Sequence, residues 1–501
     1  MKENAPTQTP DSLQAFSQLM SMGVEMTHCQ QWTQAVQCFS TAVELKPDSS
    51  MAFHQLGLAM CQLGQYQAGI ECFDSAIHLE TNNAFIFLDK GNALKESGDV
   101  QSAIDHYLHA ISLKLDYAKA YFNLASIYRQ QMRLQEAAAC YQTVLQLEPL
   151  RADVWSNLGV TMKELGEFDR ALAYFDHALE VDSTYTDAKW NKAITLLILG
   201  NYQDGWPLFE SRWQLDATRQ AMQNQHSAVL WLGDQPLHNR SILICTEQGL
   251  GDTIQCLRYL PLLVEMGAKV VVEVQSSLIR LISQFDGLTG IMTYGQPRPS
   301  TDFYCPFMSL PLAFKTELNS IPFPAGYLKA DKRLSDEWAI RLASDHKTKV
   351  GLVWSGGELF AANDRRNVAL SNFELLGTLP MSFYSLQVGA NAQQSFKDLK
   401  ATQWLGPNII DHSDSLKDFA ETAALIDNLD LVIAVDTSVA HLAGAMGKPT
   451  WILNRFDGCW RWLKNIEKSP WYLESKIYNQ INPYSWHSAM NRIKKELQNF
   501  D

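Results

Sequence analysis

One segment places an acidic side chain directly after an apolar run, where open α/β sheets bind their ligands. SILICT (241–246) is followed by EQGLGDTIQ, in which Gly249 and Gly251 are expected to permit a tight turn and Asp252 to open the next helix. Free N–H groups at such a helix start face an anion or a polar ligand. Asp252 can act as a general base there, or it can simply cap its helix. Because Ile254 replaces the third glycine of a dinucleotide fingerprint, a dehydrogenase is a weak alternative.

A second apolar run, LVIAV, ends in another group of polar side chains. Asp436, Thr437 and Ser438 follow it directly, and His441 comes one turn into the next expected helix. Hydroxyls, an imidazole and the N–H groups of a helix start suit a diphosphate. The alternative for His441 is a core histidine that faces the sheet. We expect this junction to bind the phosphates of a nucleotide.

A third segment, VGLVWSGGELFAANDRRNVAL, combines glycines with cations after a buried strand. Ser355 and Gly356 end the strand, and Arg365 and Arg366 follow in the loop. Glycine lets a ligand approach the backbone, and guanidinium groups pair with phosphate oxygens. Adjacent loop arginines are more often solvated surface, but their position after a glycine turn favours a diphosphate role.

These segments belong to a region where short apolar runs alternate with helical patterns, which is typical of parallel sheets covered by helices. The expected strands are 241–246, 269–274, 302–306, 349–354, 382–387, 431–435 and 450–453. We expect two Rossmann-like halves, 230–346 and 347–501.

The preceding part of the chain is periodic, with three registers of 34 residues. Small residues recur at Gly23, Gly57, Gly91, Ala125, Gly159 and Ala193 and again at Ala35, Gly69, Ala103, Ala137, Ala171 and Gly205, and aromatic residues at Phe39, Phe73, Tyr107, Tyr141, Phe175 and Phe209. Such a period indicates stacked helix pairs, in which small residues allow close approach and the aromatic fills the gap toward the next unit. Pro47 and Pro149 mark unit ends. The pattern resembles the tetratricopeptide repeat over about six units, residues 16–219.

A polar row follows the same period. It consists of Ser21, Gln55, Asp89, Asn123, Asn157 and Asn191. We expect this position to face the concave surface, where amides can hold the backbone of a protein or peptide partner or simply solvate the face. The row resembles the asparagine ladder of eukaryotic protein O-GlcNAc transferase. In the last unit, Trp206 and Trp213 are expected to dock the array onto the following region.

Composition narrows the classes of ligand and compartment. The formal charge of −13 opposes binding to nucleic acid, which requires a basic surface. The nine cysteines have no zinc-like spacing, and the sequence has no Asp-x-Asp pair to hold a divalent metal, so we expect no metal site. The first fifteen residues lack a signal-peptide core and no apolar run reaches membrane-spanning length, so we expect a cytoplasmic protein without a membrane span.

Residues 230–480 resemble the heptosyltransferase-like glycosyltransferases of the GT-B fold, which in bacteria are often fused to tetratricopeptide repeats. The most specific parts are EQGLGDTIQ (247–255) and DTSVAHLAGAMGKP (436–449). The resemblance implies that Asp252 is the general base and that the second junction lines the nucleotide diphosphate. The family's lysine after the third segment's strand has no counterpart here. An arginine of that segment is its expected substitute, which puts heptose itself in question.

We therefore expect an α-solenoid followed by a GT-B-like double Rossmann region that transfers a sugar from a nucleotide sugar to an acceptor hydroxyl. A carboxylate takes the proton while cations and helix N–H groups stabilise the leaving diphosphate. Inversion and independence of metal follow, with no cofactor beyond the donor substrate. The alternative is a protein-binding scaffold whose transferase-like region is inactive.

Overall fold

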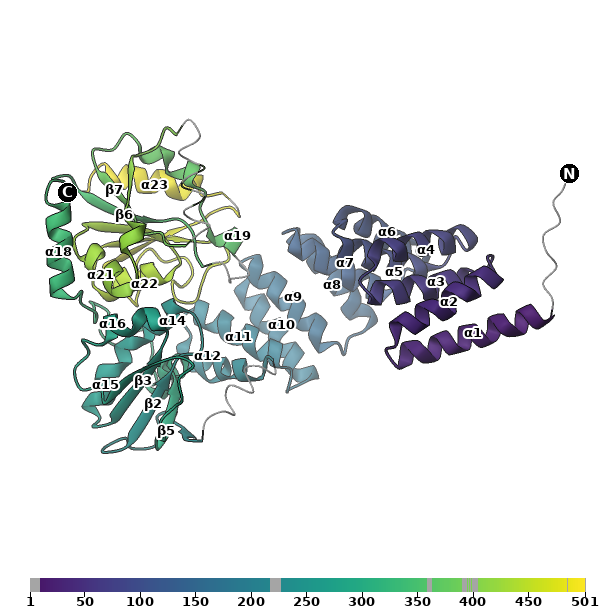
Figure 1. Cartoon of the computed structure of the whole chain (residues 1–501), viewed down its shortest axis with the longest axis horizontal. Coiled ribbons are helices and arrows are strands. Elements are labelled where there is room, and N and C mark those ends of the chain that lie inside the picture. The colour runs from purple at the N-terminus through teal and green to yellow at the C-terminus, as the bar shows by residue number, and fades with distance from the viewer. Residues whose placement is uncertain are drawn as a thin grey trace. The chain divides into compact units, whose positions relative to one another are not determined.

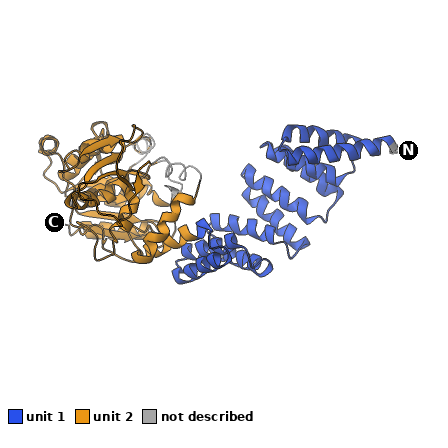
Figure 2. Ribbon diagram, turned by 90° about the horizontal axis from the view of Figure 1, so that it is seen from below, with its two compact units in different colours: residues 1–188 blue, residues 189–501 orange. Residues whose placement is uncertain are grey.

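The computed structural model describes residues 10–216, 227–357, 363–389, 394, 396, 398, 404–483 and 485–500. The chain divides into two compact units, residues 1–188 and 189–501 (Figure 2). The first consists of helices, and the second holds the final helices of the repeat pattern and all strands of the described residues.

Helical hairpins succeed one another along the first unit with the predicted period (Figure 1). They are α1 (Pro10–His28), α2 (Trp32–Leu45), α3 (Ser50–Gln62), α4 (Tyr66–Leu79), α5 (Ala84–Ser97), α6 (Val100–Leu113), α7 (Ala118–Gln130), α8 (Leu134–Leu147), α9 (Ala152–Glu164) and α10 (Phe168–Val181). The pattern ends with α11 (Thr186–Ile198) and α12 (Tyr202–Phe209), followed by the 3-10 turn η1 (Glu210–Gln214). From α2 to α12, each second helix of a hairpin begins 34 residues after its predecessor. The predicted solenoid is confirmed.

The small and aromatic registers meet within one hairpin. A Cβ on Gly57 would lie 2.7 Å from the ring of Phe73, and a Cβ on Gly159 would lie 2.6 Å from the ring of Phe175. The aromatic thus occupies the space that the glycine of its own unit leaves. The prediction that the aromatic fills the gap toward the next unit omitted this contact, in which the ring packs against the glycine of its own hairpin.

A fourth register, not recognised from the sequence, closes each hairpin with left-handed backbone. Its members are Gln30, Gly64, Gly98, Met132, Gly166 and Gly200, with φ between 57° and 94°. Glycine adopts this conformation without steric cost, whereas the Cβ atoms of Gln30 and Met132 make it sterically unfavourable.

The second unit contains two parallel sheets, which Figure 1 shows as two lobes. The strands of the first are β1 (Val229–Leu230), β2 (Ser241–Cys245), β3 (Lys269–Val274), β4 (Gly290–Thr293) and β5 (Phe303–Pro306), in the order β1-β5-β2-β3-β4. The strands of the second are β6 (Lys349–Val353), β7 (Ser382–Ser385), β8 (Ile409–Asp411), β9 (Leu431–Val435), β10 (Thr450–Asn454) and β11 (Ser475–Asn479), in the order β11-β10-β9-β6-β7-β8. All pairings between these strands are parallel.

Among the described residues of the α/β region, the helices are short, and all of them except the C-terminal α23 lie between strands. They are α14 (Leu250–Cys256), α15 (Leu260–Glu265), α16 (Ile279–Ile282), α17 (Leu310–Ala313), α18 (Lys332–Leu342), α19 (Asn363–Arg366), α21 (Phe419–Asp427), α22 (Ser438–Ala445) and α23 (His487–Leu497). Every predicted strand is present to within one or two residues, and β1, β4, β8 and β11 were missed. The architecture is consistent with a GT-B-like region. Within the described part of the chain, each helix is too short or too polar to cross a bilayer.

Candidate functional site

Asp252 lies at the third position of α14, where both of its carboxylate oxygens accept hydrogen bonds. The Gly249 N–H donates to Oδ2 over 2.9 Å, which caps the helix start. Arg461, from the segment after β10, donates through Nη2 to Oδ1. The side chain of Asp252 is 17% exposed and that of Arg461 is 14% exposed. Asp252 is thus both a helix cap and one half of an ion pair between the two lobes.

The two glycines of this junction do not act as predicted. Neither has positive φ, so the expected tight turn that needs glycine is absent at these two positions. Gly251 lies inside α14, and a Cβ there would be 2.9 Å from Cδ2 of His441 and 3.4 Å from Cα of Ser438. Glycine is required because α22 approaches α14 this closely. The two predicted junctions, 190 residues apart in sequence, therefore meet.

The second junction has the predicted order of strand, polar residues and helix. Thr437 is the N-cap residue of α22, which begins at Ser438, but its side chain makes no capping bond, and its buried Oγ1 atom has no hydrogen-bond partner among the described residues. The side chain of Asp436 is 15% exposed. Burial raises the pKa of Asp436, but the adjacent His441 and Arg461 lower it by more. The net shift of this pKa is therefore downward, which favours the carboxylate. Because α22 begins at Ser438 and β9 ends at Val435, the first N–H groups of the helix lie at the carboxyl end of this strand.

His441 is buried, with 2% of its surface exposed. Its Nδ1 lies 2.9 Å from the Tyr472 hydroxyl, and its ring stacks on Trp462 with 5.0 Å between centroids. Burial lowers the pKa of His441 to about 3. The imidazole is therefore neutral at pH 7, and Arg461 is the neighbouring cation that keeps Asp436 ionised. These contacts favour a packing role for the ring at the edge of the site.

The third segment reaches the same place through Arg366. Its Nη1 donates to the backbone oxygen of Asp436 over 3.1 Å. Its guanidinium covers Gly356 so closely that a Cβ there would lie 1.8 Å from Nη2. Glycine at 356 is thus explained by the arginine that occupies the space of a side chain. Ser355 is fixed beside it, because its N–H donates to Gln387 Oε1 over 3.0 Å.

Arg365 points to a different partner. Its Nη1 lies 3.5 Å from Asp457 Oδ2, and Arg455 Nε lies 3.0 Å from the other oxygen of that carboxylate. Lys464 also lies near Asp457, although burial lowers its pKa. Three cations therefore lie around Asp457, after the end of β10.

The cations after β10 were not predicted from the sequence. Arg455, Arg461 and Lys464 stand in RFDGCWRWLK, which has no spacing typical of a phosphate site. Together with Arg365 and Arg366, they make five cations in the described part of the chain. These cations lie around three carboxylates, those of Asp252, Asp436 and Asp457. The site has an excess of positive charge, which suits an anionic ligand.

The polar row of the repeats is half-buried at its three asparagines. Asn123 Nδ2 donates to Asn92 Oδ1 over 2.7 Å, so part of its capacity is used within the array. Asp89 lies 2.8 Å from His54 Nε2. Asn123 and Asn157 belong to the first unit and Asn191 to the second.

The terminal repeat packs onto the α/β region, as predicted for Trp206. Its indole N–H donates to the Thr316 carbonyl over 3.1 Å, and its ring lies 5.2 Å from that of Trp460. Trp213 is also buried, but its indole N–H reaches Glu210 over 3.3 Å, within η1.

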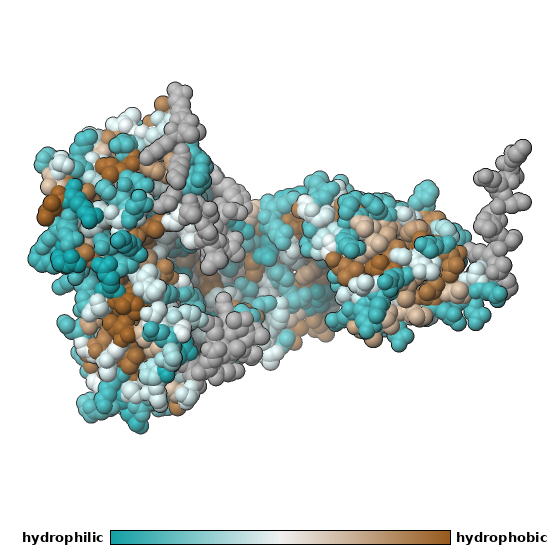
Figure 3. Space-filling view, viewed as in Figure 1, coloured by the Kyte–Doolittle hydropathy of each residue, from teal (hydrophilic) through white to brown (hydrophobic). Residues whose placement is uncertain are grey.

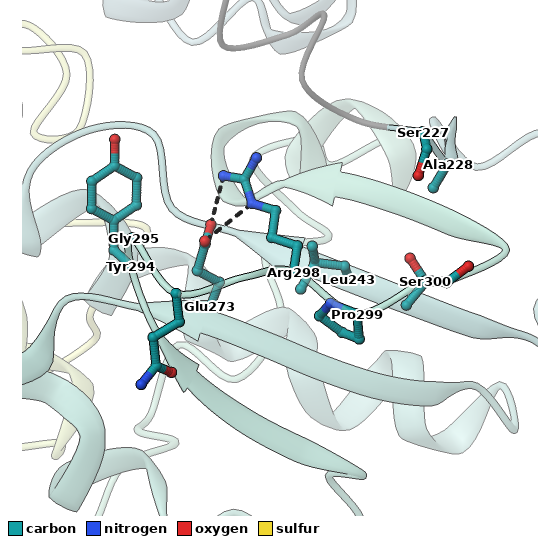
Figure 4. A pocket seen from close by; sticks show the side chains of 11 residues that line it. Ser227, Ala228, Leu243, Glu273, Tyr294, Gly295, Arg298, Pro299 and Ser300 are labelled. Carbon is teal, nitrogen blue, oxygen red and sulfur yellow. Dashed lines mark hydrogen bonds and ion pairs between the residues drawn. The ribbon is translucent and has the colours of Figure 1, made fainter.

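A cavity of about 490 Å³ opens in the first lobe, where Arg298 reaches back to the buried Glu273 (Figure 4). The predicted site residues do not line it. Within this cavity, Arg298 Nη2 lies 2.9 Å from Glu273 Oε2. The candidate chemistry therefore lies at the junction of α14 and α22.

Comparisons with known proteins match both parts of the chain. Tetratricopeptide repeat models match residues 91–131, 116–183 and 163–218, and the model of glycosyltransferase family 9 (heptosyltransferase) matches residues 417–453. That last segment contains β9 and α22 with Asp436, Thr437, Ser438 and His441.

Relatives cover the chain in part. Protein FlbA of Caulobacter vibrioides is 24% identical over an alignment of 308 residues that covers 57% of this chain and 50% of FlbA, so the chain spans about half the length of that relative. The crystal structure of MamA protein is 23% identical, with a TM-score of 0.32, and covers 34% of this chain and 92% of its own. YrrB, described as a TPR protein with an unusual peptide-binding site, is 20% identical with a TM-score of 0.31, covering 34% and 88%.

The repeat models, the family 9 segment and the two parallel sheets agree with one another. The chain combines an N-terminal solenoid of tetratricopeptide repeats with an α/β region of two parallel sheets, in which residues 417–453 are similar to glycosyltransferase family 9 (heptosyltransferase).

Proposed function

We propose that the protein is an inverting glycosyltransferase that moves a sugar from a nucleoside diphosphate donor to an acceptor hydroxyl. The observation that carries this proposal is the close packing of α14 against α22. It brings Asp252 beside the start of α22, where the diphosphate is expected to bind. The family 9 match over 417–453 supports the same assignment.

The donor is proposed to place its diphosphate at the start of α22. The Ser438 and Thr437 region offers helix N–H groups, and Arg366 supplies a guanidinium at the end of β9. The positive excess of the site would balance the charge that develops on the departing phosphate, which is the task that a divalent metal performs in other transferases. We therefore propose a metal-independent reaction.

Asp252 is proposed as the general base. Its two fixed hydrogen bonds leave further lone pairs on the carboxylate, which can accept the acceptor hydroxyl. The hydroxyl proton passes to Asp252 as its oxygen bonds to the anomeric carbon. The bond from that carbon to the phosphate oxygen breaks on the opposite face, and its electron pair leaves with the nucleoside diphosphate. This geometry inverts the anomeric centre.

The acceptor is proposed to be protein or peptide, bound by the repeats. Large hydrophobic side chains stay exposed in the first unit, including Phe85 at 52%, Leu115 at 75% and Leu150 at 80%. Figure 3 shows hydrophobic areas over the repeat helices on the face in view. Exposed apolar surface of this kind fits a protein partner, and Asn157 would add backbone hydrogen bonds.

The test begins with a thermal-shift screen of UDP-, GDP- and ADP-sugars on the full chain. A donor at a hundred times its dissociation constant should add about 2.7 kcal/mol of stability. With the best donor, Asp252→Asn should preserve binding and lower turnover by about 10²–10⁴, the usual worth of a general base. If no nucleotide sugar shifts the transition, or if the variant turns over like the parent, the proposed function is wrong. The scaffold alternative would then be preferred.

A further inference from the structure

The Asp252–Arg461 pair joins two segments that lie 209 residues apart in the chain. Asp252 is on the first lobe and Arg461 is on the segment between β10 and β11 of the second. Burial alone would lower the pKa of Arg461, but the facing Asp252 carboxylate contributes to a net rise, so the guanidinium stays charged. The proposed base is therefore held by a group from the opposite lobe.

The segment that contains Arg461 packs against α12, the last helix of the repeats. Trp471 donates its indole N–H to the Tyr202 hydroxyl of α12 over 2.8 Å. Trp460 packs edge-on against Trp206 of the same helix at 5.2 Å between centroids, and the guanidinium of Arg461 lies 4.3 Å above the Trp460 ring. The aromatic contacts fix both flanks of Arg461.

The turn η1, which follows α12, makes hydrogen bonds to the segment that precedes Asp252. Arg212 of η1 is fully buried and donates to both carboxylate oxygens of Glu247, over 2.7 Å and 2.9 Å. Glu247 also accepts the Met308 N–H over 3.1 Å. The terminal repeat is thus bonded to the segments on both sides of the ion pair.

We propose that Arg461 is a positioning residue for Asp252 and that α12 and η1 of the terminal repeat hold the two segments in the register at which they pair. This inference rests on the proposed function, in which Asp252 is the base. The guanidinium fixes one carboxylate oxygen as the Gly249 N–H fixes the other, so the remaining lone pairs have one direction toward the acceptor. A carboxylate free to rotate would lose this alignment, and small misplacements reduce rates steeply.

The experiment measures release of nucleoside diphosphate by the full chain, using the donor that gives the largest thermal shift among UDP-, GDP- and ADP-sugars. The variants are Arg461→Met, Arg461→Lys, Tyr202→Phe, Asp252→Asn and the double variant Asp252→Asn/Arg461→Met. Arg333→Met on α18 is the matched control, because its side chain is 72% exposed and paired only with the neighbouring turn in the contacts described. Calorimetry with the corresponding nucleoside diphosphate accompanies each rate.

We expect Arg461→Met to lower kcat by about 10- to 100-fold, a larger factor than the loss of nucleoside diphosphate affinity, which the remaining cations of the site sustain. We expect Arg461→Lys to restore part of the rate. Tyr202→Phe removes only the hydroxyl that Trp471 contacts and should lower kcat about two- to fivefold, which keeps the test available if Arg461→Met does not fold. In the Asp252→Asn background, Arg461→Met should cause no further loss. A purely structural residue would not show this dependence on Asp252.

Losses that multiply in the double variant overturn the inference, as does a fall in diphosphate affinity at unchanged kcat, which would make Arg461 a phosphate ligand. If Asp252→Asn itself is fully active, the proposed base fails and the inference fails with it. An inactive Asp252→Asn beside a fully active Arg461→Met refutes the positioning role alone.

Discussion

Gly356→Ala tests whether Arg366 holds the donor diphosphate without altering the arginine itself. A Cβ at position 356 would lie 1.8 Å from Arg366 Nη2 and 2.2 Å from its Cζ, so the guanidinium must leave its place above Asp436. Backbone strain is not at issue, because Gly356 does not have positive φ. The methyl group should therefore act on the arginine alone.

The expected loss follows from one charge-assisted hydrogen bond to phosphate. Such bonds are worth about 1.5–3 kcal/mol, which corresponds to nucleoside diphosphate binding that is about 10- to 150-fold weaker. Titration calorimetry on the full chain measures the dissociation constant, with Arg366→Met as the reference for complete loss. Gly357→Ala is the matched control, since a Cβ there meets no atom of the described residues within 4 Å. Equal affinity in parent, Gly356→Ala and Gly357→Ala would refute the role of the displaced guanidinium.

Two further predictions concern stability. Native His441, whose pKa burial lowers to about 3, stays neutral where the unfolded imidazole takes up a proton, so the free energy of unfolding should fall as pH decreases from 6.5 toward 3, by about 2 kcal/mol at pH 5. Urea unfolding followed by tryptophan fluorescence should show this dependence, and an equally steep dependence in His441→Gln would contradict it. Met132→Gly should stabilise the repeat unit by about 1 kcal/mol because it removes a Cβ from left-handed backbone at φ 59°, whereas Gly98→Ala should destabilise it by a similar amount. Circular dichroism during urea unfolding measures both changes, and a less stable Met132→Gly would exclude strain at this turn.

The sequence alone determined the parts of this protein that depend on local pattern. A 34-residue period places every second helix of the hairpins, because each unit repeats the same packing of a small residue against an aromatic ring. The apolar runs located the long buried strands such as β9, whereas β1 and β8, with two and three residues, are too short to leave a pattern. The polar residues after β9 were likewise visible, since a strand end followed by a helix start is a local feature.

Only the tertiary structure decided what these residues face. Gly251 was interpreted as a turn residue, yet it is required by the approach of α22, which no local pattern encodes. Arg461 was not considered at all, because its partner Asp252 lies 209 residues away on the other lobe. The physical reason is that hydrogen-bonded periodicity is set within a few residues, whereas an ion pair between lobes depends on how two complete sheets pack together. The local periodicity can therefore be read from the order of residues, whereas the ion pair between the lobes requires knowledge of the whole fold.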